Sequence, residues 1–146
     1  MKKHLIIIAL LLVMAAFAGC VQRIDRSLPE SPRAFDTGTY VNPDDPDDTY
    51  ATIRLDGRVY AVCGTAASRM TGKDVGKCLG YIVQDGEERM DDRVFPLSAD
   101  PERNYLVVIT VNGFMDQPIF YRALDTAGKD IETPAFVQSL DYGIWN

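Results

Sequence analysis

Three two-residue turn signals constrain this chain more than any other feature of its sequence. Asp56-Gly57, Asp85-Gly86 and Asn112-Gly113 each follow a run of residues rich in strand formers. Such dipeptides tolerate the positive φ angles that a type I′ hairpin turn requires, and the alternation of apolar and polar residues around the first turn is typical of strands. The sequence therefore predicts three successive β-hairpins.

The fold class predicted from these hairpins is mainly β, and α+β at most. We expect a small antiparallel sheet or partly closed barrel of about six strands, within the usual range of sheet sizes. The strands are predicted at 50–55, 58–63, 78–84, 93–97, 104–111 and 119–123. The run 105–111 is apolar on both faces, as expected of a central strand that is covered on both sides.

Two further features refine the predicted sheet. In the first hairpin a two-residue loop pairs Leu55 with Arg58 and continues in register to Ala51 opposite Val62. In the second hairpin residues 85–92 are predicted to be a charged loop. Pro96 has no N–H to donate to a neighbouring strand, which predicts that the fourth strand lies at an edge or a bulge.

One short helix is predicted near the C-terminus. Thr133 is a suitable N-cap, Pro134 occupies the first helical position, and Gly143 provides a stop. Apolar residues fall on one face of this segment, namely Phe136, Val137, Leu140 and Ile144. We expect this helix to cover an apolar face of the sheet.

The N-terminal segment has the layout of a secretory signal. Lys2 and Lys3 provide a positive start, residues 5–19 are an apolar run, and small residues precede Cys20. A run of fifteen residues is short for a membrane-spanning helix, which needs about twenty. The alternative is an ordinary secretory signal with a chance cysteine.

Phe17-Ala18-Gly19-Cys20 resembles the lipobox of bacterial lipoproteins, over residues 1–20 only. Phe17 replaces the more usual leucine. The resemblance implies cleavage before Cys20, a diacylglyceryl group on its sulfur and an acylated amine. Two or three acyl chains would hold the protein on a membrane, since each buried methylene contributes about 0.8 kcal/mol. Val21 follows Cys20 at the position where an Asp retains some lipoproteins at the inner membrane. Delivery to the outer membrane is therefore expected if the source has an outer membrane.

Three segments are predicted: a signal peptide at 1–19, an anchor cysteine with an acidic, proline-rich tether at 20–49, and a compact β domain at 50–146. Residues 21–49 contain four prolines and seven acidic residues. As a flexible coil this stretch would span roughly 30 Å. Calcium is an alternative for the acidic stretch, with Asp45, Asp47, Thr49 and Asp56 at EF-hand ligand positions. Because Tyr50 stands where that loop needs glycine, a solvated spacer is favoured.

Charge and histidine content exclude several classes of function. Without residues 1–19 the chain has thirteen basic and twenty-one acidic residues, a formal charge of −8. This charge argues against nucleic-acid partners. His4 is the chain's only histidine, so the mature chain would lack Ser-His-Asp or Cys-His catalysis and histidine-ligated zinc. No cofactor and no catalytic residue are predicted.

Cys63 and Cys78 are predicted to form a disulfide in an oxidising compartment. The bond would close a loop of about fifteen residues and contribute roughly 3 kcal/mol. The alternative is a reactive thiol, for which the only activating groups are nearby lysines and arginines.

Phe114, Met115 and Trp145 are a candidate contact surface. Phe114 and Met115 follow a predicted turn, and Trp145 is next to the last residue, so these apolar groups stand where solvent is expected. The alternative is that they fold back onto the sheet.

From the sequence we therefore expect a lipid-anchored protein on the extracytoplasmic face of the cell envelope. Its expected role is non-enzymatic binding or adaptor work, with an envelope protein or a wall glycan as partner. The alternative role is that of an inhibitor or immunity protein against an envelope-acting hydrolase, which has only size and placement in its favour.

Overall fold

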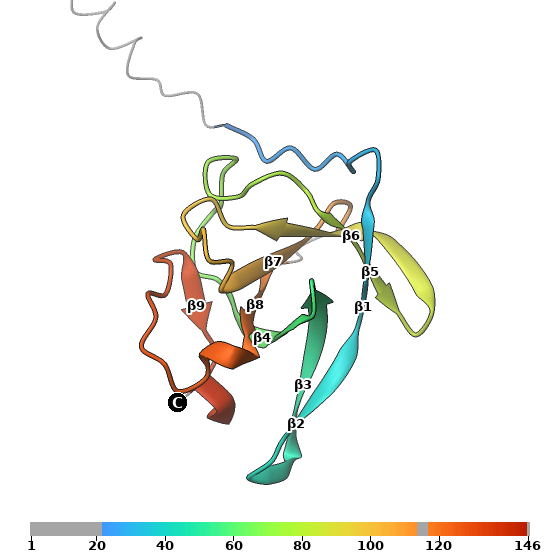
Figure 1. Ribbon diagram of the computed structural model, residues 1–146. Coiled ribbons are helices and arrows are strands. Elements are labelled where there is room, and N and C mark those ends of the chain that lie inside the picture. Colours follow the sequence, from blue (N-terminus) through green and yellow to red (C-terminus); the bar gives the residue numbers. More distant parts are fainter. Residues whose placement is uncertain (1–21, 114–116, 146) are drawn as a thin grey trace, which may run out of the picture.

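The computed structural model describes residues 22–113 and 117–145 (Figure 1). These residues form one sheet with nine strands and two short 3-10 helices. The strands are β1 (Arg33–Asp36), β2 (Gly38–Asn42), β3 (Asp45–Leu55), β4 (Arg58–Ala66), β5 (Gly80–Gln84), β6 (Glu87–Pro96), β7 (Tyr105–Thr110), β8 (Ile119–Ala123) and β9 (Val137–Ser139). The 3-10 helices are η1 (Leu124–Thr126) and η2 (Gly143–Trp145). None of the described helical segments is long and apolar enough to span a membrane.

The sheet is curled and open, and its two edges belong to one stretch of chain. The strand order is β1-β5-β6-β7-β8-β4-β3-β2, and β9 pairs with β4 beside this path. β1 pairs in parallel with β5, whereas β2 pairs antiparallel with β3. Only Thr37 separates β1 from β2. Residues 33–42 therefore border both ends of the strand order, which keeps the sheet curled round its interior.

The first predicted hairpin is confirmed. Leu55 pairs with Arg58 and Ile53 with Tyr60, as the turn signal predicts. Asp56 and Gly57 have φ angles of 50° and 82°, the left-handed values that a type I′ turn requires. β3 and β4 are longer than expected, because β3 begins at Asp45 and β4 continues to Ala66.

The second hairpin is confirmed, but its predicted charged loop is wrong. Asp85 and Gly86, both with positive φ, form the whole turn, and β6 starts at once at Glu87. A register shift between Tyr81 and Ile82 absorbs the extra residues, because Ile82 faces Arg89 while Tyr81 faces Arg93. The charged residues of 87–93 are therefore strand residues.

The sequence predicts that the fourth strand lies at an edge or a bulge; the edge position is wrong, and β6 carries a bulge against β5 between Arg89 and Arg93. β6 lies between β5 and β7. Pro96 is tolerated because it is the last residue of β6, where its carbonyl accepts a hydrogen bond from the Gly76 N–H at 2.9 Å.

The third hairpin is confirmed by the pairing of β7 with β8, and β7 is central as predicted. Its residues alternate between two apolar clusters, which explains the continuous apolar run. Leu106 and Val108 face the interior of the curl, while Tyr105, Val107 and Ile109 face the opposite side.

The predicted C-terminal helix is wrong. Residues 137–139 form β9, which pairs with the end of β4, and only Gly143–Trp145 are helical, as η2. Gly64 permits this pairing, since a Cβ there would lie 2.5 Å from the Gln138 carbonyl oxygen. A strand at this point satisfies backbone groups of β4, which a helix would leave unpaired.

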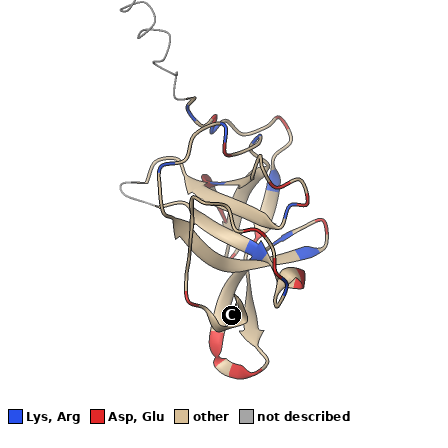
Figure 2. Cartoon of the chain, turned by 90° about the vertical axis from the view of Figure 1, so that its left-hand side faces the viewer, with Lys and Arg blue, Asp and Glu red and all other residues tan. Residues whose placement is uncertain are grey.

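Residues 33–49 are part of the sheet and not a tether, because they form β1, β2 and the start of β3. Residues 22–32 run over the sheet and also pack against it, as Ile24 and Leu28 contact the outer apolar cluster (Figure 1). Four of the acidic residues of this stretch, Asp44, Asp45, Asp47 and Asp48, gather at the tip of the β2–β3 hairpin (Figure 2).

Two apolar clusters hold the fold together, one on each face of β6, β7 and β8. The inner cluster fills the curl and contains Phe35, Ile53, Leu55, Tyr60, Ile82, Val94, Leu106, Val108, Tyr121 and Ala123. The outer cluster includes Phe95, Val107 and Phe120, and it is covered by Met70, Val75 and Cys78 of the β4–β5 connection and by Val137 of β9.

Candidate functional site

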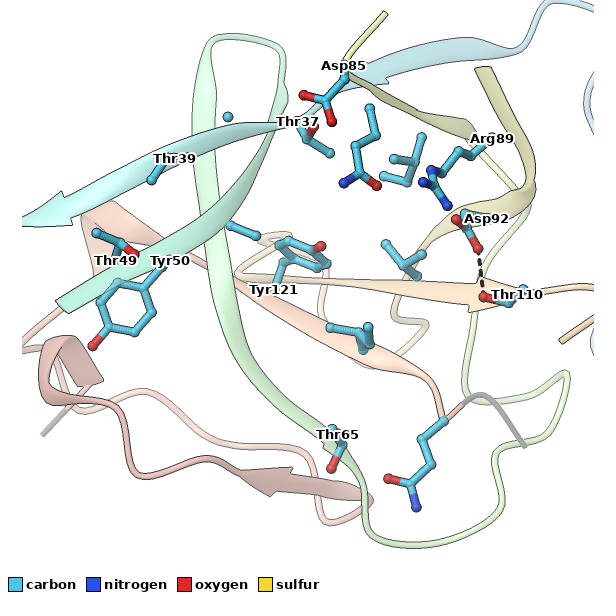
Figure 3. A pocket seen from close by; sticks show the side chains of 17 residues that line it. Thr37, Thr39, Thr49, Tyr50, Thr65, Asp85, Arg89, Asp92, Thr110 and Tyr121 are labelled. Carbon is cyan, nitrogen blue, oxygen red and sulfur yellow. Dashed lines mark hydrogen bonds between the residues drawn. The ribbon is translucent and has the colours of Figure 1, made fainter. Parts of the chain in front are cut away.

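The open end of the curled sheet holds a cavity of about 900 Å³ (Figure 3). Side chains of β2 to β8 and of the β1–β2 junction line it, so seven of the nine strands contribute to one site. Ligand sites commonly occupy about 300 to 1,000 Å³ and occur at the mouths of β-barrels. This cavity is the candidate site, and we call it the sheet mouth.

The alternation of strand residues explains why the sheet mouth is polar. Residues two apart on a strand face the same side. On β7 the inward residues are Leu106, Val108 and then Thr110, and on β5 they are Ile82 and then Gln84. The inner face thus changes from apolar side chains within the curl to polar side chains where it opens.

Neutral hydrogen-bonding groups dominate the lining. They are Thr37, Thr39, Thr49, Thr65, Thr110, Gln84, Gln117, Tyr50 and Tyr121. Each hydroxyl or amide side chain offers both a donor and an acceptor. The apolar part of the wall is formed by Ala51, Ile82, Val108 and Ile119.

Three charged side chains stand on one side of the sheet mouth, on β6 and the turn before it. They are Arg89, Asp92 and Asp85 (Figure 3). Asp92 Oδ1 accepts a hydrogen bond from the Thr110 hydroxyl at 2.7 Å. The Arg89 guanidinium makes no hydrogen bond or ion pair to any residue that the structure describes, so its donors remain available.

Tyr121 stands among the lining side chains with its ring largely enclosed (Figure 3). The residue is 7% exposed, and burial, followed by the nearby negative charge of Asp92, raises the pKa of its phenol. The hydroxyl is therefore neutral at physiological pH and acts as donor and acceptor.

Tyr50 differs from Tyr121 because its hydroxyl is directed out of the cavity. It donates to Asp48 Oδ2 at 2.5 Å, and the ring packs edge-on against Tyr142 at a centroid distance of 5.1 Å. Burial and the bond to Asp48 raise the pKa of this phenol. Tyr50 thus supplies wall surface and links the β2–β3 hairpin to the C-terminal segment.

The candidate residues predicted from the sequence do not meet at the sheet mouth. Cys20, Phe114 and Met115 lie outside the described residues. Trp145 folds back onto the sheet, since its indole Nε1 donates to the Val62 carbonyl at 3.0 Å and its ring lies 5.1 Å from the Arg122 guanidinium.

Cys63 and Cys78 are free, buried thiols in the structure, and the disulfide predicted from the sequence is not formed. Cys63 is on β4 and Cys78 precedes β5, and three strands lie between β4 and β5 in the sheet. Burial raises the pKa of the Cys63 thiol to about 12 and also raises the pKa of Cys78. Both are therefore protonated core residues.

The calcium alternative gains nothing from the described residues, which contain no cluster of three or more metal-ligating side chains. Asp45 Oδ1 accepts a hydrogen bond from the Asp47 N–H at 3.1 Å, as in a turn. The Asp48 carboxylate accepts hydrogen bonds from the Asn42 amide and the Tyr50 hydroxyl.

The sheet mouth is not predicted from the sequence, because seven of its lining residues lie in segments expected to be tether or loop. Thr37, Gly38, Thr39 and Thr49 lie in residues 20–49, and Asp85, Arg89 and Asp92 lie in 85–92. The spacing of two between Thr37 and Thr39 was the available signal, since it places both side chains on one side of an extended chain.

Comparisons with protein-family models, curated proteins and solved structures found no match for this chain.

Proposed function

We propose that this protein is a lipid-anchored extracytoplasmic binding module of the cell envelope, whose ligand enters the sheet mouth. The observation that carries the proposal is the cavity of about 900 Å³, lined by polar side chains from seven strands. A site built on strands of one sheet is rigid, and rigidity reduces the entropic cost of binding.

The anchor is proposed from Cys20 and the segment before it. The lipobox resemblance places acyl chains at Cys20, two residues before the first described residue. Residues 22–32 pack against the sheet, so the domain would lie close to the membrane surface and not at the end of a long tether. Its partner is then a component of the envelope, an envelope protein or a wall glycan.

A non-enzymatic role is favoured by the chemistry of the lining. The chain's only histidine is His4, in the signal segment, and the lining contains neither serine nor cysteine. Within the lining one hydroxyl is bonded to a lining carboxylate, that of Thr110 on Asp92 at 2.7 Å, and no other described side chain binds this carboxylate. Nucleophilic catalysis needs a nucleophile whose base is in turn oriented by a third group, and the described residues give the Thr110–Asp92 pair no such group.

The experiment that tests the anchor is the Cys20→Ser variant of the full chain, followed by membrane flotation. We expect the variant to remain unprocessed or to leave the membrane fraction, because it lacks the sulfur that carries the acyl chains. Cys78→Ser is the matched control and should float like the wild type. Wild-type processing and flotation of Cys20→Ser would contradict the proposal.

Inhibition of an envelope-acting hydrolase is the second candidate, and the β2–β3 hairpin favours it. This hairpin projects from the sheet, and its tip carries Asp44, Asp45, Asp47 and Asp48 (Figures 1 and 2). The packing of Tyr142 against Tyr50 stiffens its base. An inhibitor would titrate a purified basic wall hydrolase one to one, and an Asp44→Asn, Asp45→Asn, Asp47→Asn variant would lose this inhibition. Absence of stoichiometric inhibition would remove this candidate.

A further inference from the structure

Tyr121 is a buried residue whose hydroxyl faces the cavity and is bonded by no described residue. The residue is 7% exposed, and its oxygen forms no hydrogen bond to any residue of 22–113 or 117–145. No fully enclosed side-chain oxygen or nitrogen lacks a partner among those residues, so this hydroxyl reaches the cavity surface. The hydroxyl of a tyrosine whose ring is buried normally has a hydrogen-bond partner. Its partner must therefore come from solvent or from a bound molecule.

The groups around Tyr121 have the same property. The side chains of Thr37, Thr39, Thr49 and Thr65 form no hydrogen bond to a described residue, and neither do the amides of Gln84 and Gln117. Every one of these groups both donates and accepts. A ligand hydroxyl has the same dual character, so a ligand with many hydroxyls can satisfy this wall in several orientations.

The charges select a neutral ligand. Asp85, Asp92 and Arg89 stand together at one side of the cavity. A ligand carboxylate would meet Arg89 but also two carboxylates, and a ligand ammonium would meet the guanidinium. A neutral hydroxyl avoids both repulsions, because it donates to an aspartate and accepts from an arginine. An apolar ligand would desolvate these charges without replacing their hydrogen bonds, which is costly.

We propose that the sheet mouth binds a neutral saccharide, with the Tyr121 hydroxyl and the Arg89 guanidinium as hydrogen-bonding anchors. The inference rests on the proposed binding function and names its ligand class. The apolar patches of Ile82, Val108 and Ile119 face the C–H groups of the sugar ring, while the hydroxyls and amides meet its oxygens.

The test is titration calorimetry of the full chain in a sugar-free zwitterionic detergent. The neutral probes are maltotriose, cellotriose and triacetylchitotriose, and the charged probes are trigalacturonate and the deacetylated glucosamine trimer. We expect at least one neutral trisaccharide to bind one to one, and more tightly than its charged counterpart. Binding of charged probes alone, or of none of the five, would overturn the saccharide assignment.

The Tyr121→Phe variant tests whether the sugar binds at the sheet mouth. Loss of one hydrogen bond should weaken binding about three- to tenfold, while the melting temperature stays the same, since the hydroxyl bonds no residue of the described part of the chain. Tyr81→Phe is the matched control, because its hydroxyl bonds Glu88 outside the cavity at 2.8 Å, and it should change affinity less than about twofold.

The two proposals fail in different ways. Undiminished sugar binding by Tyr121→Phe would contradict the assignment of the sugar to the sheet mouth. A lower melting temperature of that variant would contradict the claim that the Tyr121 hydroxyl is unpaired. Neither result bears on the anchor, which depends on the flotation of Cys20→Ser. If Cys20→Ser floats like the wild type while sugar binding is intact, the envelope role is overturned and the saccharide site stands.

Discussion

Arg58 is the most connected side chain among the described residues. Its Nε and Nη2 atoms bind both carboxylate oxygens of Asp125, at 2.9 and 2.7 Å. It also donates to the carbonyl oxygens of Glu102 and Arg103 and to the Asn104 side chain. The planar fork of the guanidinium thereby ties the first hairpin to the β6–β7 connection and to η1.

Replacement of Arg58 by lysine should therefore destabilise the protein. An ammonium group cannot make two parallel bonds to a carboxylate and also reach two carbonyls. We expect Arg58→Lys to lower the free energy of unfolding by about 1 to 3 kcal/mol in urea denaturation. Arg54→Lys, at an exposed position of the adjacent β3, is the control and should have little effect. Equal stability of the two variants would contradict the role of the fork.

Burial of the Cys63 thiol makes the free energy of unfolding depend on pH. Its thiol pKa is raised from 9.0 to about 12 in the folded state, so the unfolded chain loses this proton first. The contribution of the protonated Cys63 thiol to the free energy of unfolding is complete below pH 9 and is lost as the pH rises toward about 12.

We expect the unfolding free energy of the wild type to fall between pH 9 and 11 more steeply than that of Cys63→Ala. The difference in slope is at most about 1.4 kcal/mol per pH unit. Urea denaturation at several pH values measures it, and parallel slopes would contradict burial of the thiol. Neither Cys63 nor Cys78 should react with iodoacetamide at pH 8 before unfolding.

At the scale of elements, the pairing of β1 with β5 depends on one glycine. A Cβ at Gly80 would lie 1.9 Å from the Arg33 carbonyl oxygen, which is closer than any side chain permits. Arg33 pairs with Gly80 at the start of the parallel ladder. The absence of a side chain at residue 80 therefore lets β1 approach.

Gly80→Ala should displace β1. We expect a loss of about 1 to 3 kcal/mol in unfolding free energy, together with faster amide exchange in residues 33–36. Gly86→Asn is the control, because a Cβ at Gly86 meets nothing within 4 Å and asparagine accepts its positive φ. Unchanged exchange in Gly80→Ala would show that β1 tolerates the side chain.

The elements predicted correctly are those whose signal is local. Asp56-Gly57 and Asp85-Gly86 determined their own turns, and the apolar run 105–111 identified the central strand. β1 and β9 were missed because their pairing partners, β5 and the end of β4, are distant in sequence. β2 was missed although its partner β3 follows it directly in the chain. Pro43 and Pro46 are typical of a linker. In the structure Pro43 lies in the β2–β3 turn and Pro46 is the second residue of β3.

At the scale of the whole molecule, residues 33–42 complete the sheet. They supply both terminal strands of the order, and Phe35 is a fully buried member of the inner cluster. The sheet mouth also depends on them, since Thr37, Gly38 and Thr39 line it. The site has no local signal in the sequence, because its wall exists only once this stretch closes the curl.

A chain beginning at Tyr50, the predicted start of the domain, should therefore not fold cooperatively. We expect it to lose the sharp thermal transition, whereas a chain beginning at Gln22 keeps it, because only the latter contains β1, β2 and Phe35. Circular dichroism melts of the two chains make the comparison. A cooperative transition in the shorter chain would mean that residues 33–49 are dispensable.

The parallel pairing of β1 with β5 also has a mechanical consequence. If the protein is held at Cys20, a pull on the domain is transmitted through residues 22–32 to Arg33 and then along the axis of β1. The hydrogen bonds between β1 and β5 cross this axis, so they are loaded together in shear and must break together, unlike a hairpin that opens one bond at a time. Under the proposed anchor at Cys20, a parallel strand in this position would protect the rest of the sheet from forces transmitted through residues 22–32.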